Sequence, residues 1–128
     1  MADRWASPMG SRDTERFGRQ AELVASLWLR LKGYSVLAHR VRTRVGEIDL
    51  VCRRGQCLVF VEVKGRVSTD QALHALRPRQ QQRIAAAAQY FLKMRPRLAH
   101  LDCRFDLITV DRYGRPRHVM DVWRVNGY

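Results

Sequence analysis

Apolar residues between Phe17 and Lys32 recur every three or four positions, the spacing of a helix that buries one face. Gly33 follows directly and is typical of a helix end, because glycine adopts the left-handed backbone conformation without strain. A second helical pattern covers residues 71–94, and Pro78 is expected to divide it because proline removes a helical hydrogen bond. The residues predicted on the buried face of the first helix are Ala21, Val24, Ala25, Trp28 and Leu31.

The remaining segments are short, rich in β-branched residues and separated by turns, as expected of strands. Arg53–Gln56 is a polar turn around Gly55, so the strands on either side of it are predicted to pair antiparallel. The predicted element order is αβββαββ, which indicates an α/β or α+β domain. Residues 1–15 lack periodicity and are interpreted as a disordered N-terminal tail, which leaves 16–128 as a single domain. The predicted strands span residues 34–41, 45–52, 57–64, 104–110 and 117–125.

The chain is strongly basic, since 24 lysines and arginines stand against 12 acids and give a formal charge of +12. Such an excess favours a polyanionic partner, nucleic acid first and an acidic membrane surface second, although it also serves solubility. No apolar run is long enough to span a membrane, and the first residues do not resemble a signal peptide, so we expect a cytoplasmic protein. Its three cysteines and four histidines form no recognisable metal-ligand pattern and are expected to be structural or surface residues.

Acidic residues interrupt two neighbouring predicted strands of this basic chain. Because strand side chains alternate, Glu47 and Asp49 are predicted on one face of the second strand, and Ile48 with Leu50 on the other. The tight turn between the second and third strands brings Asp49 and Glu62 towards each other. In the third strand the residues predicted to share one face are Leu58, Phe60, Glu62 and Lys64, opposite Val59, Val61 and Val63.

Carboxylates inside strands resist burial and repel one another, and a divalent cation removes both costs. Mg²⁺ prefers carboxylate oxygens and water, and it binds through one or two carboxylates together with substrate phosphate. Lys64 lies two residues beyond Glu62 and points the same way, where it could orient an attacking water or stabilise charge on phosphoryl oxygens. The pattern therefore predicts a phosphodiesterase site. The alternative is a set of ordinary salt bridges, Glu62 with Lys64 and Asp49 with an arginine.

Asp49 followed one hairpin later by Glu62-Val63-Lys64 resembles the motif of PD-(D/E)XK nucleases, with Ile48 in the place of its proline. GEIDLV at residues 46–51 combined with VFVEVKGR at 59–66 is specific. With it the sequence resembles the bacterial YraN-type family of nuclease-like proteins from about Phe17 to Val125. The resemblance implies a restriction-endonuclease-like core, a mixed central sheet flanked by helices. The further matching segments are GRQAE at residues 18–22, GY at 33–34 and RFD at 104–106.

Similarity to Holliday-junction resolvases of the same fold implies roles for single residues. Asp49 and Glu62 would be the central ligands of Mg²⁺ or Mn²⁺, the carbonyl of Val63 would help, and Glu22 on the first helix would be a further ligand. Lys64 would position or activate the nucleophilic water. The residues implied as catalytic are Asp49, Glu62, Lys64 and Glu22, with Glu47 as an accessory candidate.

Basic residues flank the predicted acidic pocket, where they would hold a phosphate backbone. The sequence departs from the family near the start of the long helix, because Gln80, Gln81 and Gln82 stand where a lysine is common. Glutamine can contact phosphate but supplies no charge. Arg77 also belongs to the basic stretch that opens this helix. The residues predicted to contact nucleic acid are Arg40, Arg42, Arg44, Arg66, Arg79, Gln80 and Arg83.

The leading hypothesis is a metal-dependent nuclease that hydrolyses phosphodiester bonds in DNA and is either nonspecific or selective for branched or single-stranded structures. The alternative is a non-enzymatic nucleic-acid-binding module that keeps the nuclease fold. A basic protein of membrane surfaces or ribosomes would explain the charge but not the acidic residues inside the strands. We expect nucleic acid as the partner, DNA before RNA, and no membrane, and we leave a homodimer open.

Overall fold

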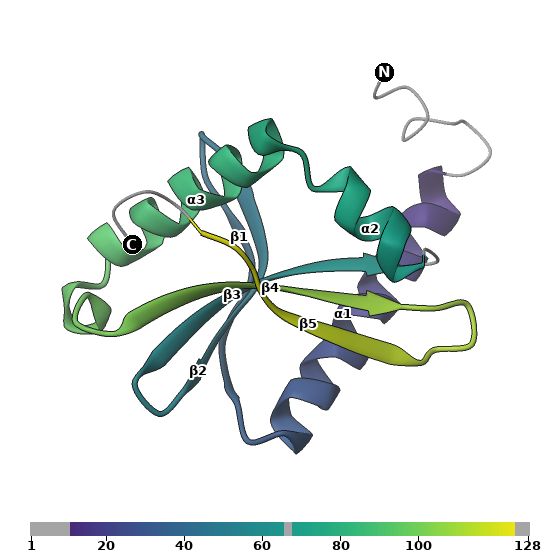
Figure 1. Cartoon of the computed structure of the whole chain (residues 1–128), viewed down its shortest axis with the longest axis horizontal. Coiled ribbons are helices and arrows are strands. Elements are labelled where there is room, and N and C mark those ends of the chain that lie inside the picture. The colour runs from purple at the N-terminus through teal and green to yellow at the C-terminus, as the bar shows by residue number, and fades with distance from the viewer. Residues whose placement is uncertain (1–10, 66–67, 125–128) are drawn as a thin grey trace.

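The computed structural model describes residues 11–65 and 68–124, with side chains from Gly18 onward. Five strands form one sheet, with helices on both of its faces (Figure 1). This confirms the predicted α/β class and element order, with the second helix divided at Pro78. The elements are α1 (Ser11–Leu31), β1 (Ser35–Arg42), β2 (Glu47–Arg54), β3 (Cys57–Gly65), α2 (Thr69–Ala75), α3 (Pro78–Lys93), the 3₁₀ helix η2 (Pro96–Leu98), β4 (Asp102–Val110) and β5 (Pro116–Trp123).

The sheet is mixed, as the resemblance implied. Its strands follow the chain order β1-β2-β3-β4-β5, and all neighbours are antiparallel except β3 and β4. A parallel pair needs a long crossover connection, and α2 with α3 provides it. The order and the crossover are compatible with a restriction-endonuclease-like core.

Two hydrophobic cores lie on opposite faces of the sheet. The first packs α2 and α3 against the sheet, and the second packs α1 against it. On α1 the buried face is Ala21, Ala25 and Leu29, whereas Leu31 is 81% exposed and Trp28 37% exposed. The prediction that these two lie on the buried face was therefore wrong. Residues 27–31 read LWLRL, which is apolar on several sides of a helix, so the spacing alone does not determine which side is buried.

Strand β3 alternates as predicted, with Leu58 and Phe60 in the core under α3 and Val59 and Val61 in the core under α1. In β2 the prediction was wrong, because Ile48 belongs to the α3 core and Leu50 to the α1 core. The residue pairs of β2 with β3 begin at Leu50↔Val61 and continue towards the turn. The regular alternation of β2 thus breaks at Asp49, between Ile48 and Leu50.

The predicted N-terminal tail falls mostly outside the described residues. Its last part, residues 11–15, lies in α1, which begins at Ser11 rather than near Phe17. No helix in the described parts of the chain is long and apolar enough to cross a membrane.

A buried ionic cluster joins the end of α1 to β4 and β5. Asp106 is fully buried, accepts hydrogen bonds from Arg104 at 2.9 and 2.8 Å, and lies 2.7 Å from Nε2 of His118. Arg104 also donates to the hydroxyl of Tyr34, and Nζ of Lys32 lies 2.7 Å from Nδ1 of His118. Burial would raise the pKa of Asp106, but the hydrogen bonds from His118 and Arg104 outweigh it and hold this pKa below its usual value.

The turn between β1 and β2 approaches the backbone of α3 so closely that only glycine fits. A Cβ atom added to Gly46 would overlap the carbonyl oxygen of Arg83 and lie 2.9 Å from its carbonyl carbon. Since a helix backbone cannot shift as a flexible side chain does, one of the two segments must move to accept a larger residue. This contact fixes the start of β2 against α3.

We expect Gly46→Ala to lower the free energy of unfolding by about 1–3 kcal/mol, the usual cost of overpacking. Urea denaturation monitored by circular dichroism measures it. Gly18→Ala is the matched control, because a Cβ at Gly18 meets no atom within 4 Å and alanine is the better helix former. Equal stability of the two variants would show that the Gly46 contact is not tight.

Candidate metal and nucleic-acid site

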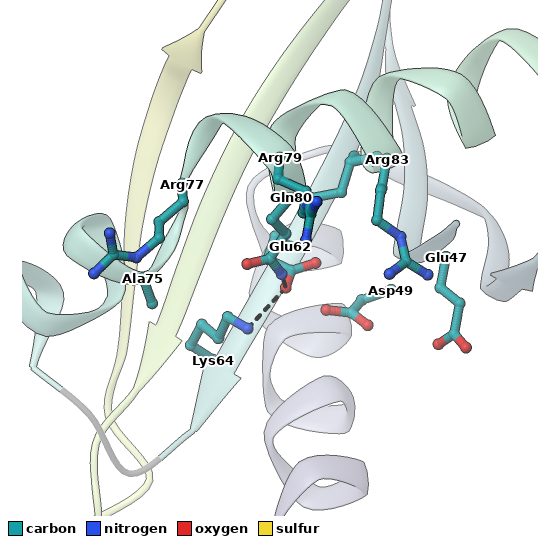
Figure 2. A pocket seen from close by; sticks show the side chains of 10 residues that line it. Glu47, Asp49, Glu62, Lys64, Ala75, Arg77, Arg79, Gln80 and Arg83 are labelled. Carbon is teal, nitrogen blue, oxygen red and sulfur yellow. Dashed lines mark hydrogen bonds and ion pairs between the residues drawn. The ribbon is translucent and has the colours of Figure 1, made fainter. Parts of the chain in front are cut away.

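The acidic residues of β2 and β3 meet the first turns of α3 in an open cavity of about 510 Å³. Figure 2 shows Asp49, Glu62 and Lys64 in it, with Arg83 extending from α3 towards Asp49 and Glu47. The structure thus brings together the central residues of the predicted site. The complete lining is Glu47, Asp49, Glu62, Lys64, Ala75, Arg77, Arg79, Gln80, Arg83 and Ile84.

Asp49 sits where the alternation of β2 breaks. Its Oδ2 accepts a hydrogen bond of 2.7 Å from the backbone N–H of Val63 in β3. Burial and the neighbouring charge of Glu62 raise the pKa of Asp49 well above its usual value, although the Val63 hydrogen bond lowers it, and Glu22 raises it further. Among the described residues no lysine, arginine or histidine forms an ion pair with Asp49. An ionised Asp49 therefore needs a positive charge that these side chains do not supply.

Glu62 is buried beside Asp49, and two further side chains donate to its carboxylate. Nζ of Lys64 and Nε2 of Gln80 each lie 3.0 Å from its Oε2. The salt-bridge alternative predicted the Glu62–Lys64 pair, and this pair is present. The same alternative predicted an arginine partner for Asp49, and no such pair exists within the described residues. Salt bridges alone thus account for Glu62 but not for Asp49.

The two carboxylates fit a hard divalent ion bound in part by substrate. Within the described residues no three acidic, histidine or cysteine side chains are grouped closely enough to form a complete metal cage. Mg²⁺ does not require one, because it commonly binds through one or two carboxylates and takes its other ligands from water and phosphate. The mutual repulsion of Asp49 and Glu62 is the cost that such an ion would remove.

A second cavity of about 340 Å³ lies on the other side of Asp49, towards α1 and β1. Glu22 is in its wall, and its Oε1 accepts a hydrogen bond of 2.9 Å from Nε of Arg40. Glu22 thus lies near Asp49, whose pKa it raises, while its own charge is paired with an arginine. The lining is Gly18, Arg19, Glu22, Arg40, Arg42, Glu47 and Asp49.

Most residues predicted to contact nucleic acid line one of the two cavities. Arg79, Gln80 and Arg83 line the first, and Arg40 and Arg42 the second. Arg44 is exposed in the turn before β2 and lines neither of these two cavities, and Arg66 lies outside the described residues.

Sequence reasoning missed two features of the site. Arg19 lines the second cavity, although an arginine in the first turns of a helix gave no signal of that place. Gln80 was predicted to contact phosphate, which stays a prediction, and the hydrogen bond that its amide donates to Glu62 was not predicted. Gln80 lines the first cavity, whereas Gln81 and Gln82 line a different one. This difference depends on how α3 packs against the sheet, which the sequence alone does not show.

Comparisons with known proteins relate this chain to one family. The sequence model of "Uncharacterised protein family UPF0102" matches residues 21–110, which include β2, β3 and the start of α3. A UPF0102 protein of Paramagnetospirillum magneticum is 48% identical over 116 residues, 88% of this chain and 90% of the relative. One of Parvibaculum lavamentivorans is 48% identical over 123 residues, 96% and 92% of the two chains. One of Maricaulis maris is 47% identical over 112 residues, 88% of each.

Proposed function

Since the chain belongs to the uncharacterised protein family UPF0102, as its resemblance to YraN-type proteins implied, we propose its function from the site that it carries. The proposed function is a Mg²⁺- or Mn²⁺-dependent nuclease that hydrolyses phosphodiester bonds in DNA. The observation that carries the proposal is the meeting of the carboxylates of Asp49 and Glu62, beside Lys64, in a groove with a basic rim.

Asp49 and Glu62 are the residues that would hold the metal ion. When bound there, the ion activates water and stabilises negative charge on the phosphoryl group. The N–H of Val63 orients the Asp49 carboxylate through Oδ2, and the amide of Gln80 does the same for Glu62 through Oε2. Asp49 is thus held by an uncharged donor alone, whereas Glu62 also has Lys64 beside it, so the two carboxylates together keep negative charge for a cation. Whether the carbonyl of Val63 also contributes stays a prediction.

Lys64 supplies a positive charge beside Glu62. Its side chain is only 20% exposed, so it is held at the groove rather than extended into solvent. An ammonium group there can donate to a phosphoryl oxygen or to the attacking water as negative charge develops. We assign Lys64 to the transition state, since the basic rim supplies the charge that binds ground-state phosphate.

The basic rim is the feature that favours nucleic acid as the substrate. Arg77, Arg79 and Arg83 line the cavity, and the side chains of Arg77 and Arg79 have large exposed parts. Arginines around an acidic centre would hold a phosphate backbone that the carboxylates alone repel. The three cysteines are free, which supports our proposal that the protein acts in the reducing cytoplasm.

The function is tested by incubating the purified full chain with end-labelled single-stranded, flapped, four-way and duplex DNA and with RNA. With Mg²⁺ or Mn²⁺, at least one branched or single-stranded DNA should be nicked or cleaved, and a chelator should stop the reaction. If every substrate stays intact with both metals while circular dichroism shows folded protein, the non-enzymatic binding module is the better account.

We expect Lys64→Ala to lower kcat about 10²–10³-fold, the usual cost of removing one donor to developing negative charge. The dissociation constant for DNA should change little, because the lysine is assigned to the transition state. Single-turnover cleavage and fluorescence anisotropy measure the two quantities. Lys93→Ala, at the far end of α3, is the charge-matched control. An equal loss of binding and cleavage in Lys64→Ala would make Lys64 an ordinary phosphate contact.

A further inference from the structure

The two cavities share a wall. Glu47 and Asp49 line both of them, so the groove beside α3 continues past Asp49 into the cavity beside α1. Since α3 and α1 cover opposite faces of the sheet, the combined groove runs around the end of the sheet where β2 begins. In the backbone register of β1 with β2, Arg42 lies opposite Glu47 as the last residue pair, which places both residues at this end of the sheet.

The charges along the combined groove form three zones. The acidic residues Glu47 and Asp49, which line both cavities, occupy the middle, and Glu62 adjoins them in the first cavity. On one side the arginines of α3 line the groove, and on the other side Arg19 and Arg42 do. A ligand with a single phosphate next to the metal ligands would use only the middle and one side. A polyanion longer than one phosphate would use all three zones.

Arg19 and Arg42 have no acidic partner within the part of the chain that the structure describes. Arg40, the third arginine of this cavity, differs because it is paired with Glu22. Its backbone has a φ of 50°, a left-handed conformation that is uncommon outside glycine. The charge of Arg40 is thus engaged by Glu22 in the wall of the second cavity, and Arg19 and Arg42 carry the positive charge that remains for a ligand.

We infer that one nucleic-acid strand passes through both cavities and is held by at least two consecutive phosphates. The cleaved phosphate lies beside Glu62 and Lys64, and the neighbouring phosphate lies beside Arg19 and Arg42. This inference rests on the proposed function. It makes the substrate a polynucleotide and not a small phosphodiester, because a ligand with one phosphate leaves the charge of the second cavity unused.

The inference is tested with Arg19→Ala and Arg42→Ala, and with Arg97→Ala as the charge-matched control. Arg97 lies in η2, which precedes β4 at the opposite end of the sheet from Lys64. The substrates are an unmodified oligonucleotide and two in which a neutral methylphosphonate replaces the phosphate on the 5′ or on the 3′ side of the mapped cleavage position. On the unmodified strand each of the two variants should raise KM roughly tenfold, the loss of one charged hydrogen bond, and leave kcat within about twofold.

On one of the two methylphosphonate substrates Arg19→Ala and Arg42→Ala should have the same KM as the wild type. The neutral linkage already removes the phosphate charge that these arginines would contact. A KM that rises equally on all three substrates would place Arg19 and Arg42 against some other part of the DNA and would overturn the inference. So would variants that behave like Arg97→Ala.

A binding measurement separates this inference from the proposed function. In the presence of chelator, where the DNA stays uncut, the slope of log Kd against log salt should become shallower by about 0.7–0.9 for each variant. If no substrate is ever cleaved but these slopes change, the nuclease proposal fails and the second phosphate site stands. If the DNA is cleaved but slopes and KM values match those of Arg97→Ala, the nuclease proposal stands and the second site fails.

Discussion

Replacing Asp49 by asparagine is expected to abolish DNA cleavage and at the same time to make the protein more stable. Cleavage should fall at least about a thousandfold, because the loss of a ligand removes the several kcal/mol by which a metal ion stabilises the transition state. The fold should gain about 0.5–2 kcal/mol, the range common for a single stabilising substitution. Asparagine keeps an oxygen that can accept the Val63 hydrogen bond, but it ends the repulsion by Glu62 and Glu22.

The gain in stability should depend on pH in a defined direction. The pKa of Asp49 is raised in the folded chain, chiefly by burial and then by Glu62, so folding favours its neutral form. The stability associated with this neutral form is complete below the unfolded-state pKa and is lost as the pH rises through the folded-state pKa. The free energy of unfolding of Asp49→Asn should therefore exceed that of the wild type most clearly above the folded-state pKa of Asp49, and least in acid.

Thermal and urea unfolding of the metal-free proteins across pH, together with single-turnover cleavage, measure both effects. Asp102→Asn is the matched control, because Asp102 is exposed at the start of β4, at the opposite end of the sheet. Full cleavage by Asp49→Asn would reject Asp49 as a metal ligand. A variant that is inactive and also less stable than the wild type would show that the inactivity reflects damage to the fold.

The largest loss of stability is expected from Asp106→Asn, about 3–5 kcal/mol, the usual cost of removing one partner of a buried ion pair. Lys32 can only donate to Nδ1 of His118, so Nε2 of His118 carries the proton that it donates to Asp106. An asparagine at position 106 leaves Arg104 without its charged acceptor. The backbone N–H of Asp121 also donates to Asp106, so the variant should loosen β5 as well as β4.

Urea unfolding at several pH values checks this expectation, again with Asp102→Asn as the control. The pKa of Asp106 is lower in the folded chain, so its ionised form stabilises the fold above the unfolded-state pKa. This stabilisation is lost as the pH falls through the folded-state pKa. The difference in the free energy of unfolding between the wild type and Asp106→Asn should therefore become smaller in acid. A loss below about 1 kcal/mol at neutral pH would contradict the role given to the cluster.

The order of elements was predictable because each depends on neighbouring residues. Val59, Phe60 and Val61 indicate a strand buried on both faces, and Pro78 divides the helices where proline must. The approach of Asp49 to Glu62 followed from a short turn at Gly55 and Gln56 and from the length of the strands.

The rest depends on contacts between residues far apart in the chain. The choice of Leu29 over Leu31 for the core is made by the sheet against which α1 packs. Ile48 and Leu50 lie on different faces because the backbone N–H of Val63 in β3 donates to the side chain of Asp49 and not to the backbone of β2. Gln80 reaches Glu62 only because α3 returns to the end of β3.

The sharing of one divalent ion by Asp49 and Glu62 is tested most directly by X-ray diffraction from crystals soaked in Mn²⁺, with data collected near the manganese absorption edge. We predict an anomalous peak between the two carboxylates, at roughly 2–2.5 Å from an oxygen of each, that is absent from Asp49→Asn crystals treated in the same way. A map without a peak, or with manganese bound only away from Asp49 and Glu62, would contradict a metal-dependent site at these residues.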